Sequence, residues 1–180
     1  QLGLDIDREL AYGHLRDLAA RTHAANSYLW IDMEQSHYVD VTLSLTKRLR
    51  EEFPRVGVCL QAYLFRTRED LEDITSRGIG VRLVKGANLA MERVEAEMNH
   101  WQQAPYATKT EVDANLKRLV ELALDPALRG AVRIGLGSHN LFDIAFSTIN
   151  LRTHVAKFGF SGNSQISSSF EIDGQFLQCH

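Results

Sequence analysis

Polar side chains interrupt four apolar, strand-like runs of the 180-residue sequence, in each case near the end of the run. Asp32 lies in "LWIDM", Gln61 in "VCLQAYL" and Arg82 in "VRLVKGA", and His139 ends "IGLGSH". A buried arginine or carboxylate is costly unless charge or hydrogen bonds satisfy it. Because catalytic groups of parallel barrels gather at the C-terminal ends of the strands, these positions favour a site for an anionic or hydrogen-bonding ligand.

The run around Arg82 also ends in a turn that suits ligand binding. Side chains alternate across a strand, so Arg82 shares one side with Val84 and Gly86, while Lys85 faces the other. The Gly86-Ala87 turn carries only small side chains and admits the close approach of a ligand. We therefore expect the side that carries Arg82 to face the site.

Two other interpretations of these residues remain open. Arg82 and Asp32 could form a structural ion pair, with Gln61 and His139 completing hydrogen bonds around them. A metal centre of His139, Asp32 and Glu34 is a second alternative, but the sequence has no H-x-H motif or histidine cluster to supply the usual nitrogen ligands. The recurrence of polar residues at corresponding strand ends favours a ligand site without a metal.

Strand-like runs alternate with amphipathic, helix-like stretches along most of the chain. Strands are predicted at 27–34, 56–65, 81–87 and 131–140, and helices at 36–53, 67–78 and 111–124. Ser36 and Thr67 are predicted to cap the first two helices, and Gly78 to end the second. The alternation indicates repeated βα units.

Two parts of the chain need separate description. The helix after the third strand carries an apolar stripe that we expect to pack in the core, formed by Met91, Val94, Met98 and Trp101. From Ser147 onward the sequence is rich in Ser, Gly and Gln, and one short strand is predicted there, near 166–172. Residues 147–180 therefore form a divergent tail.

The pattern of elements favours an α/β fold with parallel strands, because parallel neighbours need crossover connections. No G-x-G-x-x-G turn follows the first strand, so a (β/α) barrel is favoured over a dinucleotide-binding open sheet. A composition of 44% hydrophobic and 24% charged residues fits a single domain, or a piece of one, over residues 1–180. The chain does not begin with Met, and we expect it to be a piece of something longer.

Charge and cysteine content argue against several classes of function. A net charge of −3 with mixed signs predicts no nucleic-acid partner, and no Lys or Arg run suggests a membrane-surface patch. Cys59 and Cys179 match no metal or redox spacing and are expected to be incidental thiols in a reducing cytosol. No apolar run approaches the ~20 residues of a membrane span, and the first residues lack the features of a signal peptide.

Five short segments within residues 26–140 carry a family resemblance: "WIDMEQS", "CLQAYLFR", "VRLVKGAN", "APYATKTEVDAN" and "GLGSHN". In this order they resemble successive barrel segments of the proline dehydrogenase family, and "RLVKGA" is the most specific of them. The resemblance extends to the flavoprotein barrel domain of the bifunctional enzyme PutA. It implies a partial (β/α)8 TIM-like barrel that lacks its first strand or strands and its last helix.

The resemblance implies FAD at the C-terminal mouth of the barrel and hydride transfer from L-proline to flavin N5, which yields 1-pyrroline-5-carboxylate. Arg82 would stabilise the electron density that arrives at N5, and Asp32 would be the acidic group beside substrate and flavin. Gln61 would hydrogen-bond the isoalloxazine edge. Three residues would lie along the cofactor: Val84, Gly86 and Ala87. Three others would lie near its ribityl, phosphate or adenosine portion: Thr108, Lys109 and His139.

The resemblance also implies a quinone as electron acceptor, a pyrroline-5-carboxylate dehydrogenase domain in the full-length protein, and a cytoplasmic location, peripheral at the inner membrane face. Asn88 stands where the family commonly has an aromatic residue. The family's lysine-bearing early strand and its helix with paired arginines have no counterpart in this sequence, so we expect the fragment to be inactive alone. The alternatives are a non-catalytic barrel remnant that self-associates into a homo-oligomer and a metal-dependent hydrolase.

Overall fold

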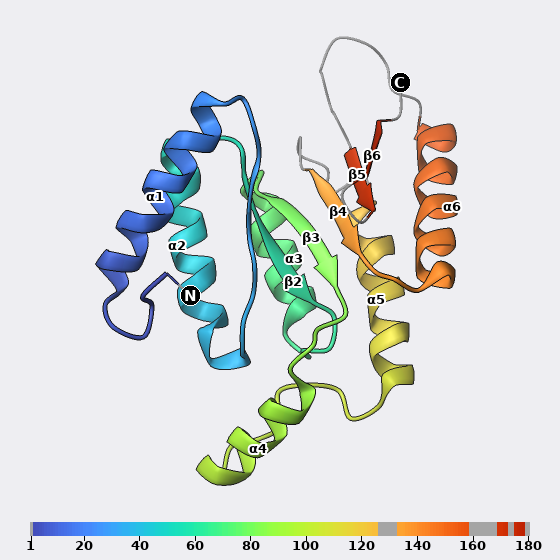
Figure 1. Ribbon diagram of the computed structural model, residues 1–180. Coiled ribbons are helices and arrows are strands. Elements are labelled where there is room, and N and C mark those ends of the chain that lie inside the picture. Colours follow the sequence, from blue (N-terminus) through green and yellow to red (C-terminus); the bar gives the residue numbers. More distant parts are fainter. Residues whose placement is uncertain (1, 126–132, 159–168, 173–174, 179–180) are drawn as a thin grey trace.

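The computed structural model describes residues 2–125, 133–158, 169–172 and 175–178, and these include one six-stranded sheet (Figure 1). The strands are β1 (Leu29–Ile31), β2 (Val56–Gln61), β3 (Gly80–Val84), β4 (Ile134–Gly137), β5 (Ser169–Ile172) and β6 (Gln175–Gln178). They are hydrogen-bonded in chain order, with β1 to β5 parallel and β6 antiparallel to β5. The predicted α/β fold with a parallel sheet is confirmed.

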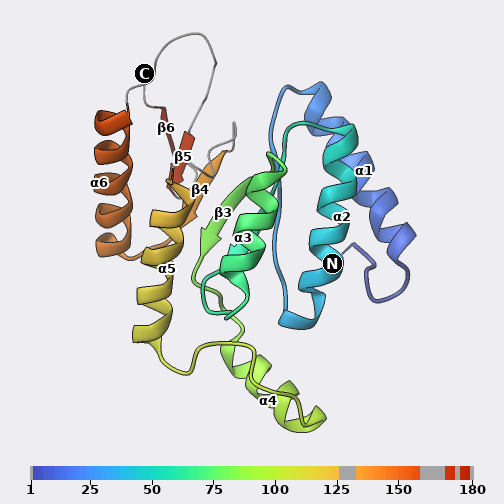
Figure 2. The same cartoon turned by 180° about the vertical axis from the view of Figure 1, so that it is seen from behind.

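Helices connect the strands and cover one face of the sheet. They are α1 (Arg8–Ala24), α2 (Val39–Glu52), α3 (Thr67–Ser76), α4 (Leu89–Asn99), α5 (Lys109–Ala123) and α6 (Leu141–Phe158), with a 3-10 turn η1 (Ser36–Tyr38) before α2. In Figure 1, α3 and α5 lie behind the strands, and Figure 2 shows them in front. Helix α4 lies beyond the C-terminal end of β3, away from this layer (Figure 1).

The main core lies between the sheet and the helices that cover it. Residues of β2 and β3 belong to one buried cluster with residues of α3 and α5; among its members are Val58, Cys59, Leu60, Val81, Leu83, Leu71, Ile74, Leu116 and Leu119. The helix predicted at 111–124 is thus present as α5, and its predicted apolar side is buried. None of the helices in the described ranges combines the length and apolar character that a membrane crossing requires.

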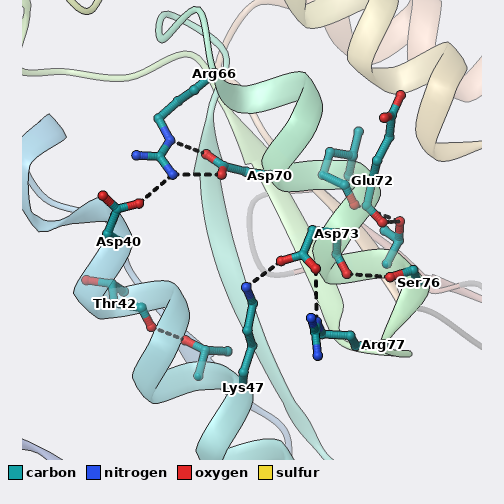
Figure 3. Close-up of polar contacts among 12 residues, drawn as sticks. Asp40, Thr42, Lys47, Arg66, Asp70, Glu72, Asp73, Ser76 and Arg77 are labelled. Atoms are coloured by element: carbon teal, nitrogen blue, oxygen red, sulfur yellow. Dashed lines mark hydrogen bonds and ion pairs between the residues drawn. The ribbon is translucent and has the colours of Figure 1, made fainter.

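Ion pairs join α2 to α3 on the outside of this core (Figure 3). Arg66 contacts Asp40 at 2.6 Å and Asp70 at 2.8 Å, and Lys47 pairs with Asp73. Most of these side chains stay partly exposed, so each pair contributes only about 0 to 1 kcal/mol. The apolar core therefore supplies most of the stability of this layer.

Two predicted helix caps are wrong. The Thr67 hydroxyl donates to the carbonyl oxygen of Gln61 at 2.5 Å, and the Ser36 hydroxyl donates to Glu92 at 2.5 Å. Neither α2 nor α3 has a side-chain cap. Each hydroxyl therefore donates to an acceptor outside its helix: Thr67 to the end of the preceding strand, and Ser36 to a distant residue that the tertiary fold brings near. Gly78 does follow the end of α3, with φ of +68°.

The apolar stripe of α4 does not lie in the core, contrary to the prediction. Its four side chains are all more than half exposed, and Met98 reaches 76%. The buried side of the helix carries Glu92 and Ala96 instead. This face is buried because Glu92 meets hydrogen-bond donors there that an apolar side chain could not use.

The tail is more regular than predicted. Helix α6 continues through Ser147 to Phe158, and β6 follows the predicted strand. Of the strand predicted at 166–172, residues 169–172 form β5, while residues 166–168 and Cys179 lie outside the described residues.

Candidate functional site

The face of the sheet opposite the helices carries the polar residues identified in the sequence. On β3, Val81 and Leu83 are fully buried, whereas Arg82 and Val84 are only partly buried on the other side. We call this second side the open face. It is here that the chain can present charged groups to a ligand.

Glycines lie beside the large side chains of the open face. A Cβ atom at Gly135 would meet the side chain of Arg82, and one at Gly137 would meet Val84. Both glycines belong to β4, and each lies opposite the side chain that it contacts in the β3–β4 register. Arg82 and Val84 therefore rest on bare backbone of the next strand.

Arg82, Asp32 and Cys59 form a closed set of hydrogen bonds on the open face, which we call the arginine cluster. Arg82 Nε donates to Cys59 Sγ at 3.0 Å, and Sγ donates to Asp32 Oδ1 at 3.0 Å. Arg82 Nη2 also pairs with Asp32 Oδ1. The ion pair left open by the sequence is thus present, but the Asp32 side chain is 74% exposed, so the pair is not a buried one.

Burial and neighbouring charges set the protonation of the arginine cluster. Burial, helped by the hydrogen bond to Asp32, raises the pKa of the Cys59 thiol, so the thiol stays neutral and remains a donor. Burial lowers the pKa of Arg82, but its contacts with Cys59 and with the Asp32 carboxylate outweigh this effect, and the pKa of Arg82 is raised overall. Arg82 therefore keeps its positive charge on the open face.

Gln61 ends β2 on the same side as Cys59. Its side chain is 5% exposed, and its Nε2 donates to the carbonyl oxygen of Met33 at 3.2 Å. Its Oε1 is buried and has no hydrogen-bond partner within the described part of the chain. An unpaired buried acceptor costs about 1 to 3 kcal/mol, so a ligand that donates a hydrogen bond here would be favoured.

The turn after β3 is shaped by Tyr63 and Gly86. Gly86 has φ of +105°, and a Cβ atom there would meet the Tyr63 ring. The buried Tyr63 hydroxyl donates to Glu92 Oε1 at 3.1 Å. Burial, together with Glu92, raises the pKa of Tyr63, so the hydroxyl keeps its proton. Gly86 and Ala87 are exposed and leave their backbone accessible to a ligand.

Glu92 anchors α4 to the loops at the C-terminal ends of the strands. It is 4% exposed and accepts hydrogen bonds from the Ser36 backbone N–H at 2.6 Å, from the Ser36 hydroxyl and from Tyr63. Ser36 follows β1 and Tyr63 follows β2. A single carboxylate thus joins three connections around the strand ends.

Replacing Glu92 by alanine is expected to lower the free energy of unfolding by about 2 kcal/mol, because the buried Tyr63 hydroxyl loses its acceptor. The control is Glu97→Ala, at an exposed position of the same helix, which should change stability by no more than about 0.5 kcal/mol. Urea denaturation measures both variants. Equal midpoints for the two would show that Glu92 does not anchor α4.

Lys85 faces the helices rather than the open face. Its Nζ lies 2.6 Å from Asp113 of α5 and 2.6 Å from Asp143 of α6. Burial lowers the pKa of Lys85, but hydrogen bonds to the two carboxylates raise it overall. Ser138 donates to Asp143 at 2.9 Å and completes the group. These contacts fasten the end of β3 to α5 and α6.

The other predicted cofactor residues lie around the strand ends, outside the arginine cluster. Thr108 is the N-cap of α5 and forms a capping box with Glu111. Lys109 pairs with Asp113 within the same helix, and its side chain is 74% exposed. His139 is exposed directly after β4. Thr108 and Lys109 therefore contribute to the N-terminus of α5, and His139 to the loop after β4.

Metal ligation gains no support from the geometry. Across the residues that the structure describes, no group of three or more His, Cys, Asp or Glu side chains is placed to hold a metal ion. Asp32, one of the two carboxylates in the proposed metal centre of His139, Asp32 and Glu34, is engaged by Arg82 and Cys59.

The chain matches the family model described as proline dehydrogenase over residues 2–159, which is most of its length. It belongs to the proline dehydrogenase family. The resemblance seen in five sequence segments is confirmed, and the match extends beyond residues 26–140 at both ends.

Two curated proline dehydrogenases illustrate the relationship. Proline dehydrogenase 2 of Bacillus subtilis (strain 168) is 33% identical over 123 residues, which cover 68% of this chain and 37% of that protein. Proline dehydrogenase of Deinococcus radiodurans is 32% identical over 114 residues, covering 62% of this chain and 34% of that protein. The chain thus spans little more than a third of the length of these proline dehydrogenases.

Solved structures of PutA, proline utilization A, share the fold. PutA from Corynebacterium freiburgense superimposes with a TM-score of 0.78 at 32% identity, over 95% of this chain and 18% of that chain. PutA from Bdellovibrio bacteriovorus, inactivated by N-propargylglycine, gives a TM-score of 0.74 at 29% identity, over 81% of this chain and 16% of that chain. The α/β sheet of this proline dehydrogenase family member is therefore consistent with part of such a barrel.

Three residues around the candidate site were not predicted from the sequence as members of it: Cys59, Tyr63 and Glu92. Cys59 was treated as an incidental thiol, although it lies two positions before Gln61 and hence on the same side of β2. Strand alternation could have identified it. Tyr63 and Glu92 meet only through the tertiary fold, and no sequence signal links them.

Proposed function

We propose that this chain contributes much of the flavin site of a proline dehydrogenase, which binds FAD and oxidises L-proline to 1-pyrroline-5-carboxylate. The observation that carries the proposal is the arginine cluster, in which the guanidinium of Arg82 keeps its positive charge on the open face of the sheet beside the exposed carboxylate of Asp32. Bound FAD would supply the hydride acceptor. A positive charge in this place suits the electron density that arrives with a hydride.

The residues of the open face fit an isoalloxazine ring. The edge of such a ring offers an N–H donor, and the buried Gln61 Oε1 lacks one. Gly135 and Gly137 keep the open-face side of the neighbouring strand β4 free of side chains. The exposed backbone at Gly86 and Ala87 allows a planar group to approach closely. These features support a flat cofactor over the strand ends.

Each residue then has a proposed role in binding or orientation. Arg82 holds its charge beside the reacting end of the cofactor, and Asp32 stands where it can face the substrate. Gln61 accepts a hydrogen bond from the ring edge. We assign three residues to the surface of the ring: Val84, Gly86 and Ala87. We assign three others to the ribityl, phosphate or adenosine portion of FAD: Thr108, Lys109 and His139. The N-terminus of α5, with Thr108 and Lys109, suits a phosphate because its N–H groups and dipole favour anions.

The partners follow from the same proposal. A quinone would reoxidise the flavin, and a pyrroline-5-carboxylate dehydrogenase domain would use the product in a bifunctional relative of the PutA type. We also propose a cytoplasmic protein that is peripheral at the inner membrane face, where such a quinone is met. The 180-residue chain alone is proposed to self-associate, because the edge of a parallel sheet can pair with another copy.

The test uses the chain extended at both ends to the length of its curated relatives, here called the extended protein. We expect the extended protein to copurify with FAD and to reduce a dye acceptor when L-proline is added. The 180-residue chain alone is expected to give no turnover and to elute as a dimer or larger species. Size-exclusion chromatography with visible-wavelength detection, followed by a dye-reduction assay, measures all of these quantities.

Two results would contradict the proposal. A colourless extended protein that cannot be reconstituted with FAD would remove the flavin assignment. Proline-dependent dye reduction by a clean monomer of the 180-residue chain would show that the segments added in the extended protein are not needed for turnover.

A further inference from the structure

Cys59 is the buried member of the arginine cluster. It lies within β2, is 2% exposed, and stands directly opposite Arg82 in the β2–β3 register. Asp32 lies just beyond the end of β1 and is largely exposed. The thiol is therefore the partner of Arg82 whose position the sheet fixes, whereas the carboxylate is open to solvent.

Two different nitrogen atoms of Arg82 donate hydrogen bonds, one to Cys59 and the other to Asp32. Nε is taken by Cys59 Sγ and Nη2 by Asp32, and Sγ closes the ring by donating to the same carboxylate oxygen. A guanidinium is planar, so fixing Nε and Nη2 also fixes the direction of Nη1. An exposed ion pair alone holds a side chain only weakly, because solvent screens it. The buried thiol adds the second point that defines an orientation.

We infer that Cys59 is a positioning residue for Arg82 and sets the orientation in which the guanidinium meets the flavin. The contact itself stands on the geometry, whereas its catalytic consequence rests on the function proposed above. A neutral thiol suits this role because it can accept from Arg82 and donate to Asp32 at the same time. Cys59 touches neither substrate nor cofactor in this assignment and acts through Arg82.

The first arm of the test needs no flavin. In the 180-residue chain with isotope-labelled arginine, the Nε–H signal of Arg82 is assigned by its loss in Arg82→Lys. Cys59→Val keeps an apolar side chain at this position, slightly larger than the thiol, but removes both hydrogen bonds, and we expect the Arg82 Nε–H proton to exchange with water about tenfold faster. Cys59→Ser retains a donor and an acceptor and should restore slow exchange.

The fold of each variant is checked by its melting temperature, and Cys59→Ala replaces Cys59→Val if the valine variant does not fold. An unchanged exchange rate in a folded Cys59→Val or Cys59→Ala protein would overturn the inference, because Arg82 would then be held without the thiol.

The second arm uses the extended protein with bound FAD. We expect Cys59→Val to lower the limiting rate of flavin reduction by L-proline about tenfold and to make the flavin harder to reduce, with KM for proline unchanged. Cys59→Ser should recover most of the rate. Wild-type rate and potential in Cys59→Val would overturn the catalytic consequence.

The two arms of the test can contradict the proposed function and the Cys59–Arg82 contact independently of each other. An extended protein that binds no FAD would defeat the proposed function and with it the catalytic consequence of Cys59. The exchange measurement in the flavin-free chain would still decide whether Cys59 holds Arg82.

Discussion

Replacing Arg82 by methionine in the extended protein is expected to lower the rate of flavin reduction by L-proline about 100- to 1,000-fold, because a fixed donor contributes that much where negative charge develops. Methionine keeps much of the apolar stem that rests on Gly135. The melting temperature should change little, since Asp32 is exposed and does not become a buried unpaired charge. Stopped-flow absorbance of the flavin and a thermal melt measure the two quantities.

A double variant, Arg82→Met with Asp32→Leu, separates this role from a structural one. A buried ion pair that loses one partner costs about 3 to 5 kcal/mol, and removing the second partner would recover that stability. The exposure of Asp32 predicts no such recovery. An Arg82→Met protein that keeps its flavin and turnover but melts far lower would make Arg82 structural and place the site elsewhere.

Gly86→Ala is expected to lower the free energy of unfolding by about 3 kcal/mol, because two costs coincide at this position. The backbone has φ of +105°, which side chains rarely adopt, and the added Cβ would meet the Tyr63 ring. Displacement of the turn should also weaken FAD binding to the extended protein by about tenfold or more. Urea denaturation and a flavin titration give the two values.

Gly13→Ala is the matched control for Gly86→Ala. Gly13 lies in α1, and a Cβ atom there would have no heavy atom within 4 Å. Alanine favours a helix over glycine, so this variant should be more stable by about 0.5 to 1 kcal/mol. Equal and small effects at the two positions would show that the turn after β3 tolerates a side chain.

The order of strands and helices could be predicted because each leaves a periodic pattern in the sequence. The same patterns do not say which side of a helix is covered. On α4 the apolar stripe was placed in the core, yet Glu92 is the buried residue, because Ser36 and Tyr63 reach it from other connections. Such contacts depend on residues far apart in the chain, and single-sequence patterns do not contain them.

The candidate site was predictable to a similar extent. Charged residues inside strands stand out, so Asp32 and Arg82 could be identified, and their pairing was one of the alternatives considered. Cys59 resembles an ordinary apolar strand residue; alternation places it on the side of Gln61, but its contact with Arg82 follows from the register that sets the two residues opposite each other. Lys85 and Arg82 are both basic and lie three positions apart. Because side chains alternate along a strand, Lys85 contacts the helices, whereas Arg82 lies on the open face.

The glycines beside the open face bear on how such a barrel is filled. A closed barrel usually fills its interior with layers of branched side chains, which supply much of its cohesion. Here Gly135 and Gly137 carry no side chain, and the space beside each is already taken by one neighbour on β3, Arg82 or Val84, so β4 adds no layer of its own to the open face. Any apolar surface of the open face that is left for a ligand stays exposed to water when the chain folds alone. A ligand held there takes over part of the packing, so occupancy of the site and stability of the fold become linked through mass action.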